Sequence, residues 1–476
     1  MLLINNKYIK FEQIIILISI LISIIWGSYN LHKFDKVKLN FDGKYYNQLL
    51  YHDLNNLWFT ADEFRKNLKN EESFINSIPK YGKWFLPSII VGYYYHLIDK
   101  EIYQTMENGD IVIKEKNFKF VLLLFQILIY FSVLSLFFRE IKKNVNSKTF
   151  NILVLFLCLE PSLLQWHSSF WSESLFLSLM ILIFYYIIKK EKKTFSFFVI
   201  GILVGLMYCQ RSVSFLYIIP IIIYFILENK KKIKNYFLLL IGYGLIILTI
   251  GTINLKKTDH FHIFSQIHQY YSFYHYFAAD IVADRKKISY IKAQELLNEN
   301  EKKWISKNKI DLKKPSDFAK NIKYRNKIFL KESIKNPIYV AKKFIKKVTV
   351  MCIIHPFWVH NHFYIDKTDP EAKSNKKKYF NKNLYKNIPY SLFIQIISIF
   401  GFICFLNKAR KKKWNLTTYD RFLIFNLLSI FYFLAITGLW GNPKYFTPCM
   451  LSLSLFFSEG FNYLKMRLFN RKYRIY

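Results

Sequence analysis

The chain has 476 residues, 53% hydrophobic and 19% aromatic, with a formal net charge of +37. Its apolar residues form long runs and not the periodic stripes of soluble helices, which argues against a soluble globular protein. The basic residues stand in short blocks between these runs, where they would set the orientation of a membrane protein. A nucleic-acid partner is not indicated, and the composition predicts an all-α polytopic membrane protein.

Five cysteines lie scattered inside or beside apolar segments without paired spacing. Neither a disulfide framework nor a zinc site is indicated. They are interpreted as small packing residues.

Taken in chain order, about ten apolar segments are candidates for crossing a hydrocarbon core of roughly 30 Å as helices. The first lacks a small-residue cleavage site and is interpreted as a retained anchor. The ten segments are 11–28, 118–138, 150–164, 170–188, 195–209, 213–227, 236–253, 390–406, 422–439 and 445–461.

The connections between these segments fix a predicted orientation. With a cytoplasmic N-terminus, every inner connection is strongly basic, whereas the short turns 165–169 and 440–444 carry almost no positive charge, as the positive-inside rule requires. The inner connections are 139–148, 189–193, 230–234, 408–413 and the tail 465–474.

Two further apolar stretches, 84–98 and 338–359, are predicted to lie along the outer surface, because one extra crossing would place basic loops outside. A possible helix N-cap lies near Ser316. The predicted organisation is an N-terminal transmembrane module (1–255) with a catalytic first outer loop (29–117), an outer loop with amphipathic helices (256–389), and C-terminal transmembrane helices with a basic tail (390–476).

The first outer loop offers carboxylates beside aromatic rings. Asp42 is followed by Gly43, which permits a tight turn, and by Tyr45 and Tyr46, which could anchor at the interface or stack on a sugar. A loop carboxylate is ordinarily just solvated, so composition alone makes Asp42 a candidate only. Rival acids in the same loop are Asp53, Asp62 and Glu63.

Charged residues also lie at the outer ends of spans. Arg211 breaks the charge pattern of the chain, and a guanidinium there is suited to hold a phosphate, although it could merely snorkel. Lys444 and Tyr445 offer a second cation and a phenol at the outer start of the last span. Glu173, at the start of the fourth span, is either a site residue or a complement to the helix dipole.

Histidines cluster as His260 and His262, and as His355, His360 and His362. Their spacing fits no compact ligand pattern, so no metal site is predicted, although His262 remains a candidate site residue. No phosphate-cradling glycine-rich loop or nucleotide fingerprint occurs.

The predicted layout begins with one span, an outer loop with an early aspartate and an in-plane helix. A bundle with short loops and a late outer loop follow. This layout resembles that of the GT-C membrane glycosyltransferases. Residues 41–46 (FDGKYY) look like the aspartate-then-aromatic motif of the first loop, and 82–87 (GKWFLP) stand where its proline-containing helix lies. Residues 325–339 are similar to a helix of bacterial members related to the protein O-mannosyl, aminoarabinose and rhizobial lipopolysaccharide sugar transferases. Residues 171–176 and 210–212 look like the GPI mannosyltransferase II branch.

The resemblance implies an enzyme that moves a sugar from a polyprenyl-phosphate carrier to a lipid, glycan or protein acceptor on the outer face, with inversion. Asp42 would be the general base, and Arg211 and Lys444 would stabilise the phosphate leaving group. Gly43 stands where other members have the second acid of an Asp-Glu pair, which argues against a metal-assisted or two-carboxylate version. No cofactor is expected to be required, and a divalent metal is left open as the alternative.

The partners implied are the lipid-linked donor, the acceptor and membrane lipids, with no nucleic acid. The expected location is a bacterial plasma membrane with the site on the periplasmic side. The alternative is a multi-pass transporter, or a flippase or polymerase of lipid-linked glycans. The span centres are almost free of charge, which favours a surface-facing enzyme.

Overall fold

The computed structural model describes residues 3–4, 7–8, 10–34, 61–70, 77, 86–105, 111–113, 116–168, 172–190, 192–228, 233–258, 261, 263, 273–312, 314–356, 370–439 and 443–469. Helices make up nearly all of this part. Two short antiparallel hairpins accompany them, β1 (Leu3–Ile4) with β2 (Lys7–Tyr8) and β3 (Tyr103–Thr105) with β4 (Ile111–Ile113). The predicted all-α polytopic membrane class is confirmed.

Each of the ten predicted spans coincides with a helix, a helix pair, or a helix that begins with a short 3₁₀ turn. The bundle consists of α1 (Phe11–Phe34), α5 (Lys116–Ile141), α6 (Ser147–Leu159), α7 (Pro161–His167), α8 (Ser172–Ile188), α9 (Thr194–Gln210), η1 (Ser212–Ser214), α10 (Ile218–Leu227), α11 (Ile233–Thr258), α18 (Pro370–Lys411), α19 (Thr418–Thr437), η3 (Pro443–Phe446) and α20 (Thr447–Phe469).

Length and composition identify five helices in the described part as candidate membrane spans: α1, α5, α11, the Asn387–Lys411 part of α18, and α19. The pair α6–α7 makes a sixth candidate that is bent by 48°. The apolar stretches in α8, α9 and η1–α10 are shorter, at 10–17 residues. The predicted count of ten crossings therefore stays a prediction.

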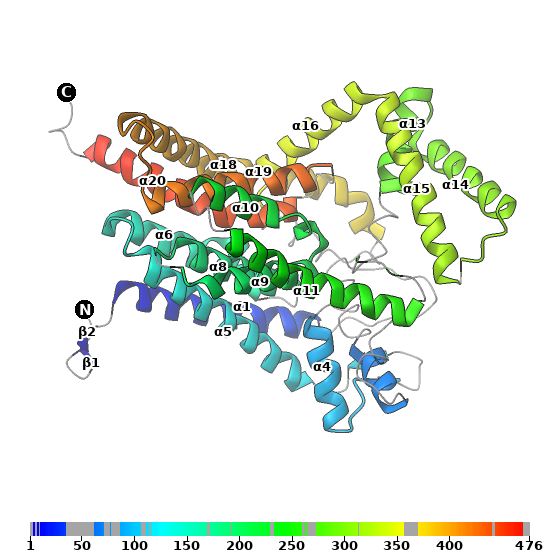
Figure 1. The fold of residues 1–476 in the computed structure, drawn as a ribbon, viewed down its shortest axis with the longest axis horizontal. Coiled ribbons are helices and arrows are strands. Elements are labelled where there is room, and N and C mark those ends of the chain that lie inside the picture. The colour runs from blue at the N-terminus through cyan, green and yellow to red at the C-terminus, as the bar shows by residue number, and fades with distance from the viewer. Residues whose placement is uncertain are drawn as a thin grey trace.

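The start of α1 and the end of α20 lie at one end of the bundle, and helices α13–α16 project from the other end (Figure 1). Ion pairs join basic connections to neighbouring helices at the end that the sequence predicts to be cytoplasmic. Lys142 contacts Glu12 of α1 at 2.7 Å, Lys192 contacts Glu228 at 2.9 Å, and Lys408 contacts Asp420 of α19 at 3.0 Å. The lysines of the basic connections thus form ion pairs that hold neighbouring helix ends together.

Glycines allow two helix pairs to approach closely. A Cβ atom on Gly401 of α18 would collide with the carbonyl of Phe456 on α20, and one on Gly460 of α20 would collide with the carbonyl of Ile397. A Cβ atom on Gly201 of α9 would likewise collide with the carbonyl of Leu239 on α11. Small residues bring the backbones of membrane helices into van der Waals contact, which drives their association where lipid supplies no hydrophobic force.

Helices outside the bundle lie on the side predicted to be external. They include the helix of residues 61–70, α4 (Leu86–Leu97) and an outer module. The outer module consists of η2 (Phe273–Ala278), α13 (Ala279–Lys286), α14 (Tyr290–Lys307), α15 (Pro315–Lys335) and α16 (Pro337–Ile353). Neither α4 nor α16 is a candidate span, in line with the two apolar stretches predicted to lie along the surface.

Two expectations for the outer module were wrong. The N-cap of α15 is Lys314 and not Ser316, because Pro315 takes the first helical position, which suits its fixed φ and missing N–H. The stretch 325–339 is not one helix, because α15 ends at Lys335 and α16 begins at Pro337. A proline cannot continue the hydrogen-bond ladder of the preceding helix.

Charged side chains dock α16 onto the rest of the module. Lys343 forms an ion pair with Asp280 of α13 at 2.5 Å. Burial alone would lower the pKa of Lys343, but the hydrogen bond and charge of Asp280 raise it. Lys347 lies 4.3 Å from the ring centroid of Phe277, and burial, with the charge of Lys343, lowers its pKa to about 8.

The longest helix, α18, has 42 residues and contains Pro389 in its interior. Its candidate span begins two residues earlier, at Asn387. Next to the proline, Ser391 donates a hydrogen bond to the carbonyl of Cys352 on α16 at 2.9 Å. The helix therefore contacts the end of α16 where the predicted membrane segment starts.

We predict that Gly401→Ala and Gly460→Ala each lower the free energy of unfolding by about 1–3 kcal/mol, because the new methyl group overpacks a backbone-to-backbone contact. Gly244→Ala in α11 is the matched control, since no atom lies within 4 Å of a Cβ built there. Thermal denaturation in detergent measures the difference. Equal stability of all three variants would contradict close packing at this crossing.

Candidate functional site

Arg211 lies where α9 ends. Its backbone is extended, with φ −146° and ψ 119°, and its N–H donates to the carbonyl of Met207 at 2.9 Å, which closes the last turn of the helix. The hydroxyl of Ser214 donates to the carbonyl of Arg211 at 2.7 Å and holds the following turn. Arg211 is half-buried and stands on a short connection between two apolar helices.

The side chain of Arg211 meets the aromatic ring of Tyr445, which precedes α20. Its Cζ atom lies 5.6 Å from the ring centroid, a cation–π distance. Arg211 and Tyr445 line one pocket together with side chains from α8, η1, α19 and α20, namely Phe176, Leu177, Val213, Phe433, Thr437, Thr447 and Pro448. A permanent cation therefore faces mostly apolar walls.

The pocket is small. The space not filled by atoms amounts to about 310 Å³ with its open mouth included, and the interior has room for about one water molecule. A sugar ring does not fit inside it.

Hydrogen bonds fix two walls of this pocket. The indole N–H of Trp166 on α7 donates to Oγ1 of Thr447 at 2.7 Å, and both side chains are buried. Oγ1 of Thr437 lies 3.7 Å from Sδ of Met351, near the end of α16. The pocket is thus braced by α7 on one side and by the outer module on the other.

Two more predicted residues lie on the backbone beside this pocket. Glu173 is in the first turn of α8, which supplies Phe176 and Leu177 to the pocket wall. Lys444 is in η3 and directly precedes Tyr445. The structure describes the backbone of Glu173 and Lys444 but not their side chains, so their roles stay predictions.

The remaining predicted site residues lie outside the described residues, and their roles also stay predictions. They are Asp42, Asp53, Tyr45, Tyr46 and His262.

A rival acid of the first loop, Asp62, is described. It lies in the helix of residues 61–70, is 7% exposed, and forms ion pairs with Arg65 at 3.2 Å and Lys66 at 2.8 Å. Both of its oxygens are therefore engaged on its own helix. Glu63 neighbours it on the same helix.

Of the predicted cluster His355, His360 and His362, the structure describes His355, while the other two lie outside the described residues. In the described part of the chain no three His, Cys, Asp or Glu side chains gather as metal ligands. His355 instead meets a carboxylate: its Nε2 lies 2.7 Å from Oε1 of Glu160, and both side chains are 1% exposed.

Glu160 was not among the predicted site residues. It stands in the break between α6 and α7, where its side chain accepts the N–H of Leu163 at 2.9 Å and the hydroxyl of Ser162. The Glu-Pro pair before Ser162 is a helix-start signal that could have revealed it, because proline favours the first position of a helix.

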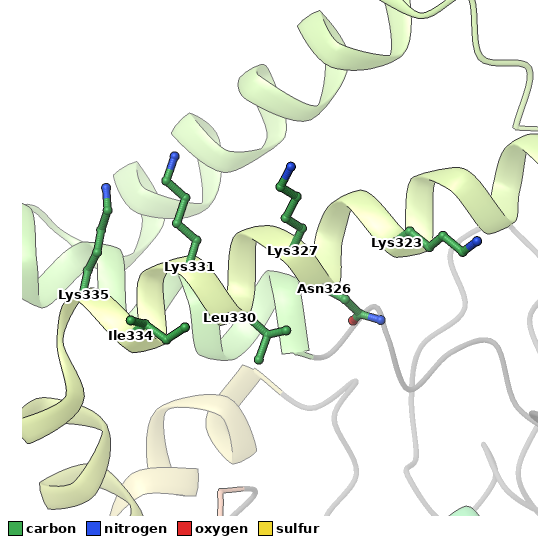
Figure 2. A pocket seen from close by; sticks show the side chains of 7 residues that line it. All are labelled: Lys323, Asn326, Lys327, Leu330, Lys331, Ile334 and Lys335. Carbon is green, nitrogen blue, oxygen red and sulfur yellow. The ribbon is translucent and has the colours of Figure 1, made fainter.

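A second, shallower hollow lies along the exposed face of α15 (Figure 2). Leu330 and Ile334 are exposed on one edge of this face, and three lysines extend along the other edge. The lysines are Lys327, Lys331 and Lys335, and the hollow is also lined by Lys323 and Asn326. It shares no residue with the Arg211 pocket and has the features of a solvated helix face.

Residues 113–253 match the model of the dolichyl-phosphate-mannose-protein mannosyltransferase family, which belongs to the GT-C superfamily. The matched segment runs from the end of β4 through most of α11 and contains Glu160, Glu173 and Arg211. The match shows that this segment is similar to a family of GT-C glycosyltransferases and confirms the resemblance predicted from the sequence. No curated protein and no solved structure matches the chain.

We predict that Thr447→Val lowers the free energy of unfolding by about 1–3 kcal/mol, because it deprives the buried Trp166 N–H of this acceptor. Thr252→Val in α11 is the control, since Thr252 is exposed and bonds only within its own helix, to the carbonyl of Leu248. Unfolding in detergent compares the two variants. A larger loss for Thr252→Val would show that the Trp166–Thr447 contact does not stabilise the pocket.

Proposed function

We propose that the protein transfers a sugar from a polyprenyl-phosphate carrier to an acceptor on the outer face of the membrane. The observation that carries this proposal is the Arg211 pocket, in which a cation faces mostly apolar walls where α9 ends and where α8 and α20 begin. The family match over residues 113–253 supports a glycosyltransferase and a lipid-phosphate donor.

The pocket suits a lipid-linked phosphate in its chemistry. A guanidinium offers two parallel N–H donors to a phosphate and keeps its charge at every physiological pH. The apolar surroundings strengthen that electrostatic contact relative to water. Arg211, with Lys444 and Tyr445 beside it, would stabilise the charge that develops on the phosphate as it leaves.

An apolar path for the carrier tail starts beside the pocket. Leu216, Ile219, Ile223 and Ile226 are exposed at spacings of three and four residues, which places them along one face of α10 and the turn before it. The face begins next to Val213 of the pocket wall. An isoprenoid chain can lie along such a stripe while its phosphate meets Arg211.

The acceptor hydroxyl needs a base, and Asp42 is proposed for this role. Because the pocket interior is too small for a sugar, the proposal places the phosphate at Arg211 and the sugar outside it, on the side of the first outer loop. Attack by the deprotonated hydroxyl on the anomeric carbon, with departure of the carrier phosphate, inverts that centre. The proposed sugar is a hexose or a pentose, and the proposed acceptor is a lipid, a glycan or a protein. The proposed membrane is the bacterial plasma membrane.

Transfer of radiolabelled sugar from a polyprenyl-phosphate donor in proteoliposomes tests Arg211. We predict that Arg211→Gln lowers kcat/KM by about 100-fold or more, because the leaving phosphate loses its fixed cation. Arg211→Lys should retain part of the activity, since it keeps the charge and loses the two-pronged geometry. Wild-type kcat/KM in Arg211→Gln would remove Arg211 from the donor site.

The same assay tests the base. We predict that Asp42→Asn lowers kcat by about 10²- to 10⁴-fold with little change in KM for the donor, because a proton acceptor acts in the transition state. Asp62→Asn is the control, since both oxygens of Asp62 are already engaged. Full activity of Asp42→Asn would refute its role as base, and no transfer by the wild type from any polyprenyl donor would refute the proposed function.

A further inference from the structure

The contact between Glu160 and His355 joins two parts of the chain that are far apart in sequence. Glu160 caps α7 inside the bundle, whereas His355 follows the last turn of α16 in the outer module. Their side chains are almost completely buried and 2.7 Å apart. The ring of Tyr390 on α18 packs against His355 with the centroids 4.9 Å apart, which encloses the pair further.

The same two segments brace the Arg211 pocket. From Glu160, α7 leads within two turns to Trp166, whose N–H holds Thr447. From His355, α16 leads back one turn to Met351, whose sulfur contacts Thr437. Both threonines line the pocket. The Glu160–His355 contact therefore links α7 and α16, the two segments that contact the pocket walls.

We propose that Glu160 and His355 are positioning residues that hold α7 and α16 together and so fix the pocket walls at Thr437 and Thr447. This assignment rests on the proposed donor site for its effect on catalysis, while its structural part stands alone. Because both side chains are 1% exposed and neither lines the pocket, they act through Trp166 and Met351 and do not touch substrate.

Because Glu160 is buried, its carboxylate needs partners at this position. A carboxylate in an apolar interior is costly unless it is paired and hydrogen-bonded. Glu160 meets this requirement only while Ser162, Leu163 and His355 surround it. Movement of α16 away from α7 would take His355 from the carboxylate and leave Ser162 and Leu163 as its partners, so the docked arrangement is favoured.

The chain contains a matched ion pair for comparison. Lys192 and Glu228 lie 2.9 Å apart with side chains 1% and 6% exposed, in the region predicted to be cytoplasmic, and neither lines the Arg211 pocket. Glu160→Gln and Glu228→Gln each neutralise one buried carboxylate with the same change of atoms. A purely structural effect would be common to both variants.

The experiment uses the full chain in nanodiscs with two readouts. Hydrogen–deuterium exchange follows the peptides that contain Thr437 and Thr447, and binding of farnesyl phosphate reports the donor site. We expect Glu160→Gln to accelerate exchange in both peptides and to weaken binding by about tenfold, whereas Glu228→Gln changes neither. His355→Gln should repeat the effect, and the double variant should be no worse than either single one.

Unchanged exchange at Thr437 and Thr447 in both Glu160→Gln and His355→Gln would overturn the proposal, as would the same acceleration in Glu228→Gln. If one of the two variants does not fold, the other decides. Failure of the wild type to bind farnesyl phosphate would count against the proposed function, and the exchange comparison would still decide whether the pair positions the walls.

Discussion

A chain that crosses hydrocarbon must satisfy its backbone N–H and C=O groups internally, and the rest of this structure follows from that constraint. Continuous helices satisfy it directly. In the bent pair α6–α7, Glu160 replaces the missing backbone partner by accepting the N–H of Leu163. The carboxylate then needs a partner of its own, and His355 supplies it from the outer module. The requirement of one interrupted helix thus contributes to the docking of α16 against the bundle, beside the contacts of Met351 and Cys352.

The sequence was sufficient for properties that depend on local composition. Apolar runs located all the bundle helices, because burial in lipid requires long uncharged segments. The basic blocks predicted which helix ends share a side, and the contacts of Lys142, Lys192 and Lys408 fall in those blocks. Arg211 could be identified because it breaks this charge pattern. Its contact with Tyr445 brings together two residues that the sequence had singled out separately.

Contacts between distant segments could not be predicted in the same way. Glu160 lay inside a window interpreted as one apolar span, and His355 was grouped with histidines near it in sequence, although its structural partner is on another helix. The pocket walls at Thr437 and Thr447 depend on how α7, α16, α19 and α20 pack, which no single segment encodes. The placement of Ser316 failed because Pro315 competes for the helix start. The role of Asp42 stays a prediction.

The proline inside α18 has a mechanical consequence. A 42-residue helix is about 60 Å long, twice the thickness of the hydrocarbon core, and Pro389 removes one hydrogen bond from its ladder. On the inner side of that point, Ser391 is tied to α16, and Gly401 is packed against α20. Pro389 therefore weakens the ladder of α18 at the boundary between the part that is held by α16 and α20 and the part that precedes it in the chain.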